Sequence, residues 1–283
     1  MNQGRANHIL GYPPDARLLI LNADDFGMCH SMNQAIIHTL ETGPVRSTSL
    51  MAPGPWAPQA YRYLSKHPET AFGIHLTAIS DPDDYRWGPL VSKEQAPTLV
   101  DRGGYFHKFE AMPALLARLE LGELELEFRA QIEHVLEAGL KPTHLDWHAL
   151  RLQGREEMMD LLVRLAKAYG LALRVMGRAT IEKLQAQGLP ASDYDFIDSY
   201  LIPPEDRPAR YAQLLRALPA GLSELAVHPG LDSAELRALE PGGNRERPVD
   251  YEFWTSGLAK EIVEREGIII LDYRPLQAAW QAL

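Results

Sequence analysis

The sequence lacks several features that mark secreted, membrane-spanning or nucleic-acid-binding proteins. Its one cysteine, Cys29, cannot form a disulfide within the chain, which fits a reducing compartment. No apolar run approaches 18 residues, and residues 1–16 have no long apolar core, so neither a transmembrane helix nor a secretory signal is expected. A net charge of −10 without a dense Lys/Arg run argues against nucleic-acid and anionic-membrane partners. We therefore expect a cytoplasmic protein. The sequence leaves the oligomeric state open and is compatible with a homo-oligomer.

The chain also lacks repeats, low-complexity tracts and a Ser/Gly-rich linker, so nothing divides it into two domains. We expect an N-terminal extension over residues 1–16 and a single catalytic domain over residues 17–283. Within that domain, strand-like and helix-like patterns alternate with short connections, which predicts an α/β fold of parallel strands flanked by helices. Seven or so such units favour a (β/α) barrel over an open sheet. The strands are expected at 17–23, 47–52, 70–77, 141–148, 171–176, 193–200, 223–230 and 267–273.

Polar side chains follow the apolar part of most of these predicted strands. Active sites of parallel α/β folds lie at the carboxyl ends of the strands, so these side chains are expected to meet at one face. They are Asp24, Asp25, His75, His144, Asp146, His148, Arg174, His228 and Asp272. Each one alone has a structural explanation, since an aspartate can cap a helix and a single buried histidine can simply be hydrogen-bonded. His144, Asp146 and His148 alternate, however, so a strand would point all three to one face.

One carboxylate and two imidazoles make a chemically sound metal site. Nitrogen and oxygen donors of this kind suit Zn²⁺, Mn²⁺, Ni²⁺, Co²⁺, Fe²⁺ or, less naturally, Mg²⁺. A divalent cation would also offset the repulsion between the adjacent carboxylates of Asp24 and Asp25. One aspartate could then bind the metal while the other stays ionised beside it as a general base.

Five motifs resemble those of the YdjC-like carbohydrate deacetylases, the group of the chitooligosaccharide and hopanoid-associated deacetylases. They are NADDFG, STSLM, GIHLT, KPTHLDWH and HPG, and they occur in family order over residues 17–230. The resemblance implies a distorted (β/α) barrel related to the polysaccharide deacetylase fold. It also implies a hydrolase that removes N-acetyl groups from amino sugars or short oligosaccharides with a divalent metal, Mg²⁺ by family resemblance.

The resemblance assigns roles to individual residues. It implies Asp25, His75 and His148 as metal ligands, Asp24 as the general base and His228 as the general acid or a group that steadies the intermediate. The long 79–111 loop after the His75 strand carries Trp87 and Arg86. We expect these two side chains, together with Asp146 and Arg174, to contact the sugar, Trp87 by stacking on a ring.

The sequence departs from the family pattern at two positions. Trp147 replaces a small residue, and Leu150 stands where a second histidine is common, which predicts an altered substrate preference rather than an inactive site. Three other functions stay open. The chain could be a non-catalytic sugar-binding protein with a relic metal site, or an iron enzyme that uses two histidines and one carboxylate. It could also be a metal-dependent hydrolase that acts on another amide.

Overall fold

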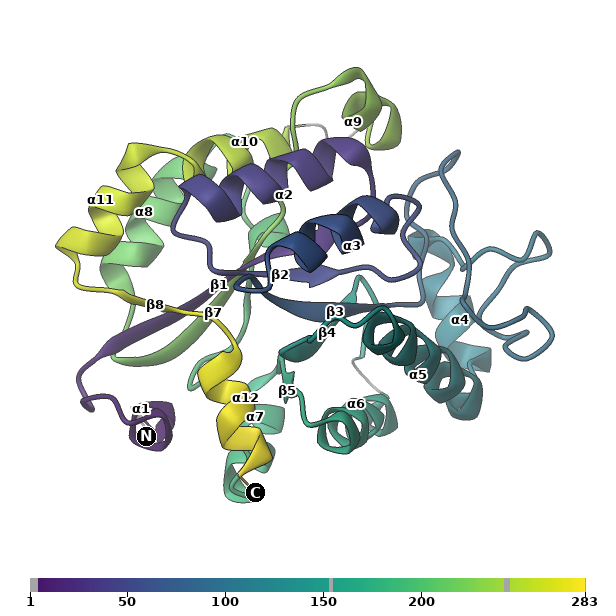
Figure 1. The fold of residues 1–283 in the computed structure, drawn as a ribbon, viewed down its shortest axis with the longest axis horizontal. Coiled ribbons are helices and arrows are strands. Elements are labelled where there is room, and N and C mark those ends of the chain that lie inside the picture. Colours follow the sequence, from purple (N-terminus) through teal and green to yellow (C-terminus); the bar gives the residue numbers. More distant parts are fainter. Residues whose placement is uncertain (1–4, 153–154, 242–244, 283) are drawn as a thin grey trace.

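The computed structural model describes residues 5–152, 155–241 and 245–282. Their centre is an eight-stranded parallel sheet in the order β5-β4-β3-β2-β1-β7-β6, with β8 paired to β1 outside this path. The first half of β1 pairs with β8 and the second half with β2. This arrangement confirms the predicted α/β, distorted-barrel fold (Figure 1). The strands are β1 (Arg17–Phe26), β2 (Ser47–Leu50), β3 (Ala71–Thr77), β4 (His144–His148), β5 (Ala172–Leu173), β6 (Ile197–Asp198), β7 (Gly221–Val227) and β8 (Ile269–Leu271).

Helices surround the sheet on its outer side (Figure 1). The α-helices are α1 (Arg5–Leu10), α2 (His30–Thr42), α3 (Ala57–Lys66), α4 (Met112–Arg118), α5 (Leu121–Glu137), α6 (Glu156–Tyr169), α7 (Arg178–Ala186), α8 (Arg207–Ala217), α9 (Ala234–Leu239), α10 (Glu246–Trp254), α11 (Gly257–Arg265) and α12 (Arg274–Gln281). Two short 3-10 helices, η1 (Phe109–Ala111) and η2 (Ser199–Leu201), complete the set. None of these helices has the length and apolar character needed to cross a membrane.

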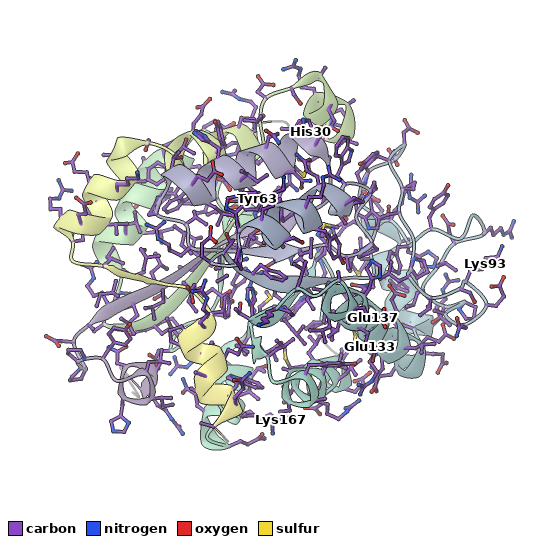
Figure 2. All side chains as sticks on the ribbon, in the orientation of Figure 1. His30, Tyr63, Lys93, Glu133, Glu137 and Lys167 are labelled. Atoms are coloured by element: carbon purple, nitrogen blue, oxygen red, sulfur yellow. The ribbon has the colours of Figure 1, made fainter. Side chains whose placement is uncertain are left out.

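The hydrophobic core lies between the sheet and the helices. All residues of β2, β3, β4 and β7 are buried, as expected for parallel strands covered by helices. The helices keep polar residues on the outside: Glu133 and Glu137 of α5 and Lys167 of α6 are exposed (Figure 2). The core therefore fixes the strands rigidly and leaves their carboxyl ends to carry polar side chains.

The pattern VDYEFWTSGLAKEIVEREG predicts a single helix over residues 249–267, but the structure has two helices there. The reason is that α10 ends at Trp254 and Ser256 caps α11 by accepting a hydrogen bond from the Ala259 amide. The segment expected as an N-terminal extension contains α1, which packs against β7 and α12. The Ala6 amide there donates to Asp193 at 3.2 Å. The domain boundary at residue 17 stays a prediction.

Candidate metal centre

A bulge near the end of β1 explains how two adjacent aspartates reach one site. In the pairing of β1 with β2, the three steps from Ala23 to Phe26 match the two steps from Thr48 to Leu50. Asp25 has φ 71°, a left-handed conformation that is uncommon for a residue other than glycine. The bulge interrupts the alternation of a regular strand, which would point neighbouring side chains to opposite faces. Both carboxylates therefore approach the same imidazole, that of His75.

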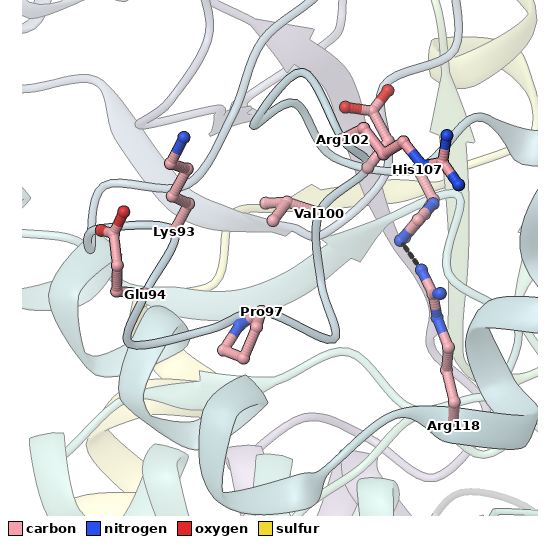
Figure 3. A pocket seen from close by; sticks show the side chains of 8 residues that line it. Lys93, Glu94, Pro97, Val100, Arg102, His107 and Arg118 are labelled. Atoms are coloured by element: carbon pink, nitrogen blue, oxygen red, sulfur yellow. Dashed lines mark hydrogen bonds between the residues drawn. The ribbon is translucent and has the colours of Figure 1, made fainter.

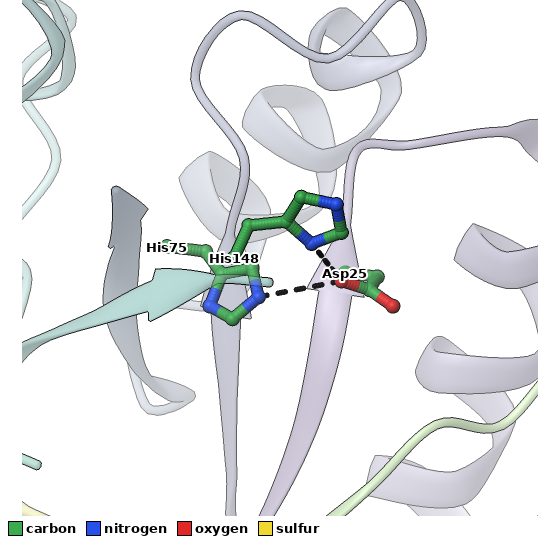
Figure 4. A group of neighbouring side chains, drawn as sticks. All are labelled: Asp25, His75 and His148. Atoms are coloured by element: carbon green, nitrogen blue, oxygen red, sulfur yellow. Dashed lines mark hydrogen bonds and ion pairs between the residues drawn. The ribbon is translucent and has the colours of Figure 1, made fainter. Parts of the chain in front are cut away.

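Asp25, His75 and His148 form a compact buried triad (Figure 4). Asp25 Oδ1 lies 3.3 Å from His75 Nε2 and 3.0 Å from His148 Nδ1. The register of β3 and β4 pairs Thr77 with His148, so His75 and His148 lie two residues apart on the same face. The three donor atoms, which come from β1, β3 and β4, all lie within 4.8 Å of one another.

Each imidazole of the triad is oriented by a second carboxylate. Asp146 Oδ1 lies 2.9 Å from His75 Nδ1, and Asp81 Oδ2 lies 2.7 Å from His148 Nε2. Burial alone would lower the pKa of both histidines, but the nearby carboxylates outweigh it. They raise the pKa of His75 to about 9 and that of His148 to about 10. The pocket thus stabilises positive charge at the place where the donor atoms converge.

These residues fit a divalent cation. Two imidazole nitrogens and a carboxylate oxygen form a donor set that borderline metals such as Zn²⁺ accept, and carboxylates that orient ligating histidines are a regular part of such sites. The carboxylates around the triad also outnumber the guanidinium groups. The carboxylates belong to Asp24, Asp25, Asp81 and Asp146, and the guanidinium groups to Arg174 and Arg247. The protonated rings of His75 and His148 balance this difference, and a bound cation would supply positive charge in place of their protons, but the donor set does not identify the metal.

Asp24 lies beside the triad and is held by a buried arginine. Arg174 donates from Nη1 to Asp24 Oδ2 at 2.7 Å and from Nη2 to Asp24 Oδ1 at 2.9 Å. Burial would raise the pKa of Asp24, but the Arg174 charge and the neighbouring His75 lower it below its usual value. Asp24 Oδ2 also faces two imidazoles, with His75 Nε2 at 4.0 Å and His228 Nε2 at 3.9 Å. Asp24 is therefore an ionised carboxylate between the triad and His228.

The side chains expected to contact the sugar have partners inside the protein. Trp87 is buried, and its indole N–H donates to the Ile79 carbonyl at 2.9 Å. Arg86 donates to Asp101 at 3.1 Å, which ties the 79–111 loop together. Asp146 and Arg174 are buried and contact each other at 3.0 Å beneath the aspartate pair. Direct contact of these four side chains with a sugar stays a prediction.

Two strand-exit residues lie outside the cluster. β8 ends early, since its last residue, Leu271, pairs with Ile20, four residues before Asp24. Asp272 consequently accepts a hydrogen bond from the Arg274 amide at the start of α12. His144 shares the face of β4 with Asp146 but stacks on the Tyr273 ring, with centroids 3.5 Å apart. His144 Nε2 also lies 3.6 Å from Asp146 Oδ2 and 3.3 Å from Ser49 Oγ, so His144 supports Asp146 from beneath the site.

The two departures from the family motif are core residues. Trp147 alternates with Asp146 and His148 on β4, so its side chain points to the opposite face, and it is buried in the hydrophobic core. Leu150 belongs to the same core. An effect of either residue on substrate preference stays a prediction.

Several site residues carry no signal in the sequence. Arg247 of α10 donates to Asp25 Oδ2 at 2.7 Å across 222 residues of chain, and Asp81 of the loop after β3 reaches His148. Glu224 of β7 accepts from Arg174 Nε at 2.6 Å. Strand alternation could have placed Glu224 on a face of β7, but no local pattern relates Arg247 or Asp81 to the aspartate pair.

Two described cavities have walls that exclude the metal-binding triad. One of about 570 Å³ lies among residues of the 79–111 loop and α4 (Figure 3). It is lined by Lys93, Glu94, Pro97, Val100, Asp101, Arg102, His107 and Arg118. A second, of about 490 Å³, lies between η2 and α8. Neither cavity is lined by a residue of the triad.

Comparisons with known proteins agree with this geometry. The family model described as YdjC-like protein matches residues 18–265. A carbohydrate deacetylase of Thermus thermophilus is 32% identical over 94% of this chain and 94% of its own length. A carbohydrate deacetylase of Thermoanaerobacter pseudethanolicus is 28% identical over 92% of this chain and 100% of its own. The crystal structure of a putative cellobiose-phosphate cleavage protein from Enterococcus faecalis matches with a TM-score of 0.78 and 26% identity, covering 92% of this chain and 99% of that one. The chain belongs to the YdjC-like protein family.

Proposed function

We propose that this protein is a metal-dependent hydrolase that removes N-acetyl groups from amino sugars or short N-acetylated oligosaccharides. The observation that carries the proposal is an ionised carboxylate, Asp24, beside a buried triad of metal-binding donor atoms. Relatives that match nearly the full length of the chain are named carbohydrate deacetylases, which supports the substrate class. We expect an acetylated mono-, di- or trisaccharide as substrate and no nucleic-acid or membrane partner.

A divalent cation held by Asp25, His75 and His148 would supply Lewis-acid chemistry that activates water and stabilises negative charge on the acetyl oxygen. Asp24 Oδ2 accepts the proton of the attacking water. Arg174 keeps Asp24 ionised for this purpose, because its two N–H groups bind both carboxylate oxygens. Oδ2 retains a lone pair on the side that faces the two histidines.

His228 completes the reaction on the other side of Asp24. Its Nε2 lies 3.9 Å from Asp24 Oδ2, so a scissile amide bound at the cation would lie within reach of both groups. His228 Nε2 donates a proton to the amide nitrogen as the carbon–nitrogen bond breaks. The products are acetate and the free amino sugar, which balances the water consumed.

Two rival functions share part of this site. Non-haem iron oxygenases also use two histidines and one carboxylate, and a relic site would keep the triad without turnover. The ionised Asp24 and the nearby His228 favour hydrolysis, because an acid and a base on opposite sides of a scissile amide are what hydrolysis requires. An oxygenase would lose its activity under anaerobic conditions, and a binding protein would release no acetate.

The test is acetate release from N-acetylated mono-, di- and trisaccharides. We expect turnover that a chelator abolishes and that one or more of Mg²⁺, Zn²⁺, Mn²⁺, Co²⁺ and Ni²⁺ restores, under air and under nitrogen alike. Restoration separates metal dependence from damage by the chelator. Sugar binding without acetate release under any of these ions would contradict the proposed activity.

A further inference from the structure

A series of buried polar side chains leads away from His228 on the side opposite Asp24. Its first contact is Ser199 of η2, whose Oγ lies 2.8 Å from His228 Nδ1. Ser199 also lies beside Tyr211 of α8 and lowers the pKa of its phenol, against the effect of burial. Ser199 and Tyr211 are both 0% exposed, so solvent does not compete for these groups. The proposed mechanism uses neither residue.

The last member of this series is Asp250 of α10, which holds His228 at two points. Asp250 Oδ1 accepts from the Tyr211 hydroxyl at 2.5 Å and from Arg207 Nη1 at 3.1 Å. Asp250 Oδ2 accepts from the backbone N–H of His228 at 2.8 Å. The same carboxylate therefore anchors the His228 backbone directly and faces its ring through Tyr211 and Ser199. Burying an Asp–Arg pair is costly unless hydrogen bonds compensate for it. Asp250 and Arg207 are both buried, and both are hydrogen-bonded.

The chemistry of the partners fixes the direction of each hydrogen bond. An ionised carboxylate only accepts, so Tyr211 donates to Asp250. Tyr211 oxygen is then free to accept from Ser199, and Ser199 oxygen to accept from His228 Nδ1–H. Burial and the Asp250 charge raise the pKa of Tyr211 well above its usual value, so the phenol stays a donor. This order places the proton of a neutral His228 ring on Nδ1.

We propose that Ser199, Tyr211 and Asp250 are positioning residues that fix the tautomer of His228, leaving Nε2 directed at Asp24 and the scissile amide. The proposal rests on the proposed function for the role of His228 as proton donor. With Nδ1–H bound, Nε2 is the nitrogen that gains and loses the catalytic proton.

Other charged groups also face the His228 ring. Asp24 lies 3.9 Å from Nε2, and Asp198 lies 3.9 Å from Nδ1, beyond hydrogen-bond distance. Asp198 Oδ1 instead accepts from the Tyr200 amide at 2.9 Å. The Tyr200 ring stands 4.4 Å from that of His228, with Arg247 on the Tyr200 ring. Neither Asp24 nor Asp198 accounts for the tautomer, because Ser199 holds Nδ1.

The direct test is nitrogen NMR of histidine-labelled protein, with the His228 signals assigned by their absence in His228→Gln. At alkaline pH, where the neutral ring is observed, we expect the proton on Nδ1 in the wild-type protein. Ser199→Ala should move the ring toward the Nε2–H form or a mixture, and Tyr211→Phe should do so partially. Ser47→Ala is the matched control, since Ser47 is a buried serine of β2 whose hydroxyl has no partner among the described residues.

Kinetics supply the second readout. We expect Ser199→Ala to lower kcat for an acetylated sugar about tenfold or more at unchanged KM. An activated aryl acetate, whose leaving group needs no proton, should lose almost nothing in the same variant. Equal losses on both substrates would point to general damage and contradict the proposal.

The two proposals fail in different ways. The positioning role of Ser199, Tyr211 and Asp250 is overturned if the neutral His228 ring of the wild-type protein carries its proton on Nε2. It is also overturned if Ser199→Ala leaves the tautomer unchanged. Both results hold whether or not the protein cleaves sugars. The tautomer could behave as expected in a protein that releases no acetate from any acetylated sugar. That result supports the positioning role of the three residues and overturns the proposed function.

Discussion

Replacing Asp24 with asparagine should lower kcat for acetate release by about 10² to 10⁴-fold while leaving the bound metal in place. The amide cannot accept the proton of the attacking water, and Asp24 is the ionised carboxylate beside Asp25 that faces His75 Nε2 without belonging to the triad. The measurement is kcat together with the metal content of the same preparation, so that loss of chemistry is separated from loss of the cation.

The control for this variant is Asp160→Asn on α6. Asp160 is an exposed carboxylate paired with Lys183 and lies outside the site, so activity and metal content should both match the wild-type protein. Near-normal turnover in Asp24→Asn would show that another group takes the proton. Loss of metal together with turnover would show instead that Asp24 is itself a ligand.

Replacing Arg174 with methionine should destabilise the fold by about 3–5 kcal/mol, because it leaves buried carboxylates without their counter-ion. Arg174 contacts Asp24, Asp146 and Glu224, and its side chain is only 3% exposed. Denaturant unfolding of the metal-free protein measures this free energy. Arg164→Met is the control, since Arg164 is a half-exposed partner of Glu125 and such pairs contribute about 0–1 kcal/mol. Equal unfolding free energies for the two variants would contradict the assigned role of Arg174.

The same substitution should change the pH dependence of activity. In the native protein the Arg174 charge holds the pKa of Asp24 below its usual value, against the effect of burial. Without Arg174, burial dominates and the pKa of Asp24 rises. Activity requires ionised Asp24, so the acid limb of the rate profile of any folded, active variant should move to higher pH.

The sequence predicts the outline of this molecule well because its signals are local. Apolar runs followed by helical patterns predicted parallel strands, and the ends of those strands predicted that Asp24, Asp25, His75 and His148 would meet. The family resemblance added roles to these positions. The short helices α1, α4 and α9 lack the long amphipathic pattern by which a helix is predicted from sequence. The pattern over 249–267 is continuous, so it did not predict the break between α10 and α11 at Thr255 and Ser256.

The remainder of the site depends on contacts that no local pattern encodes. The bulge that turns Asp25 toward His75 arises from pairing with β2, and Arg247 reaches Asp25 from a helix near the end of the chain. Asp272 illustrates the opposite error. It follows a strand and was expected at the site, but β8 ends with Leu271 paired to Ile20, four residues before Asp24. The position of a residue on a strand thus predicts which face of the sheet its side chain lies on. Its height along the sheet can be known only from the register in which the strands pair.

The most direct measurement of the central claim is the divalent metal content of the protein after reconstitution, compared with His75→Ala, His148→Ala and a surface control. We expect about one ion per chain in the wild-type protein and in His38→Ala, whose side chain is exposed on α2, and a large loss in the other two variants. Undiminished metal content in folded His75→Ala and His148→Ala would contradict a cation bound by Asp25, His75 and His148.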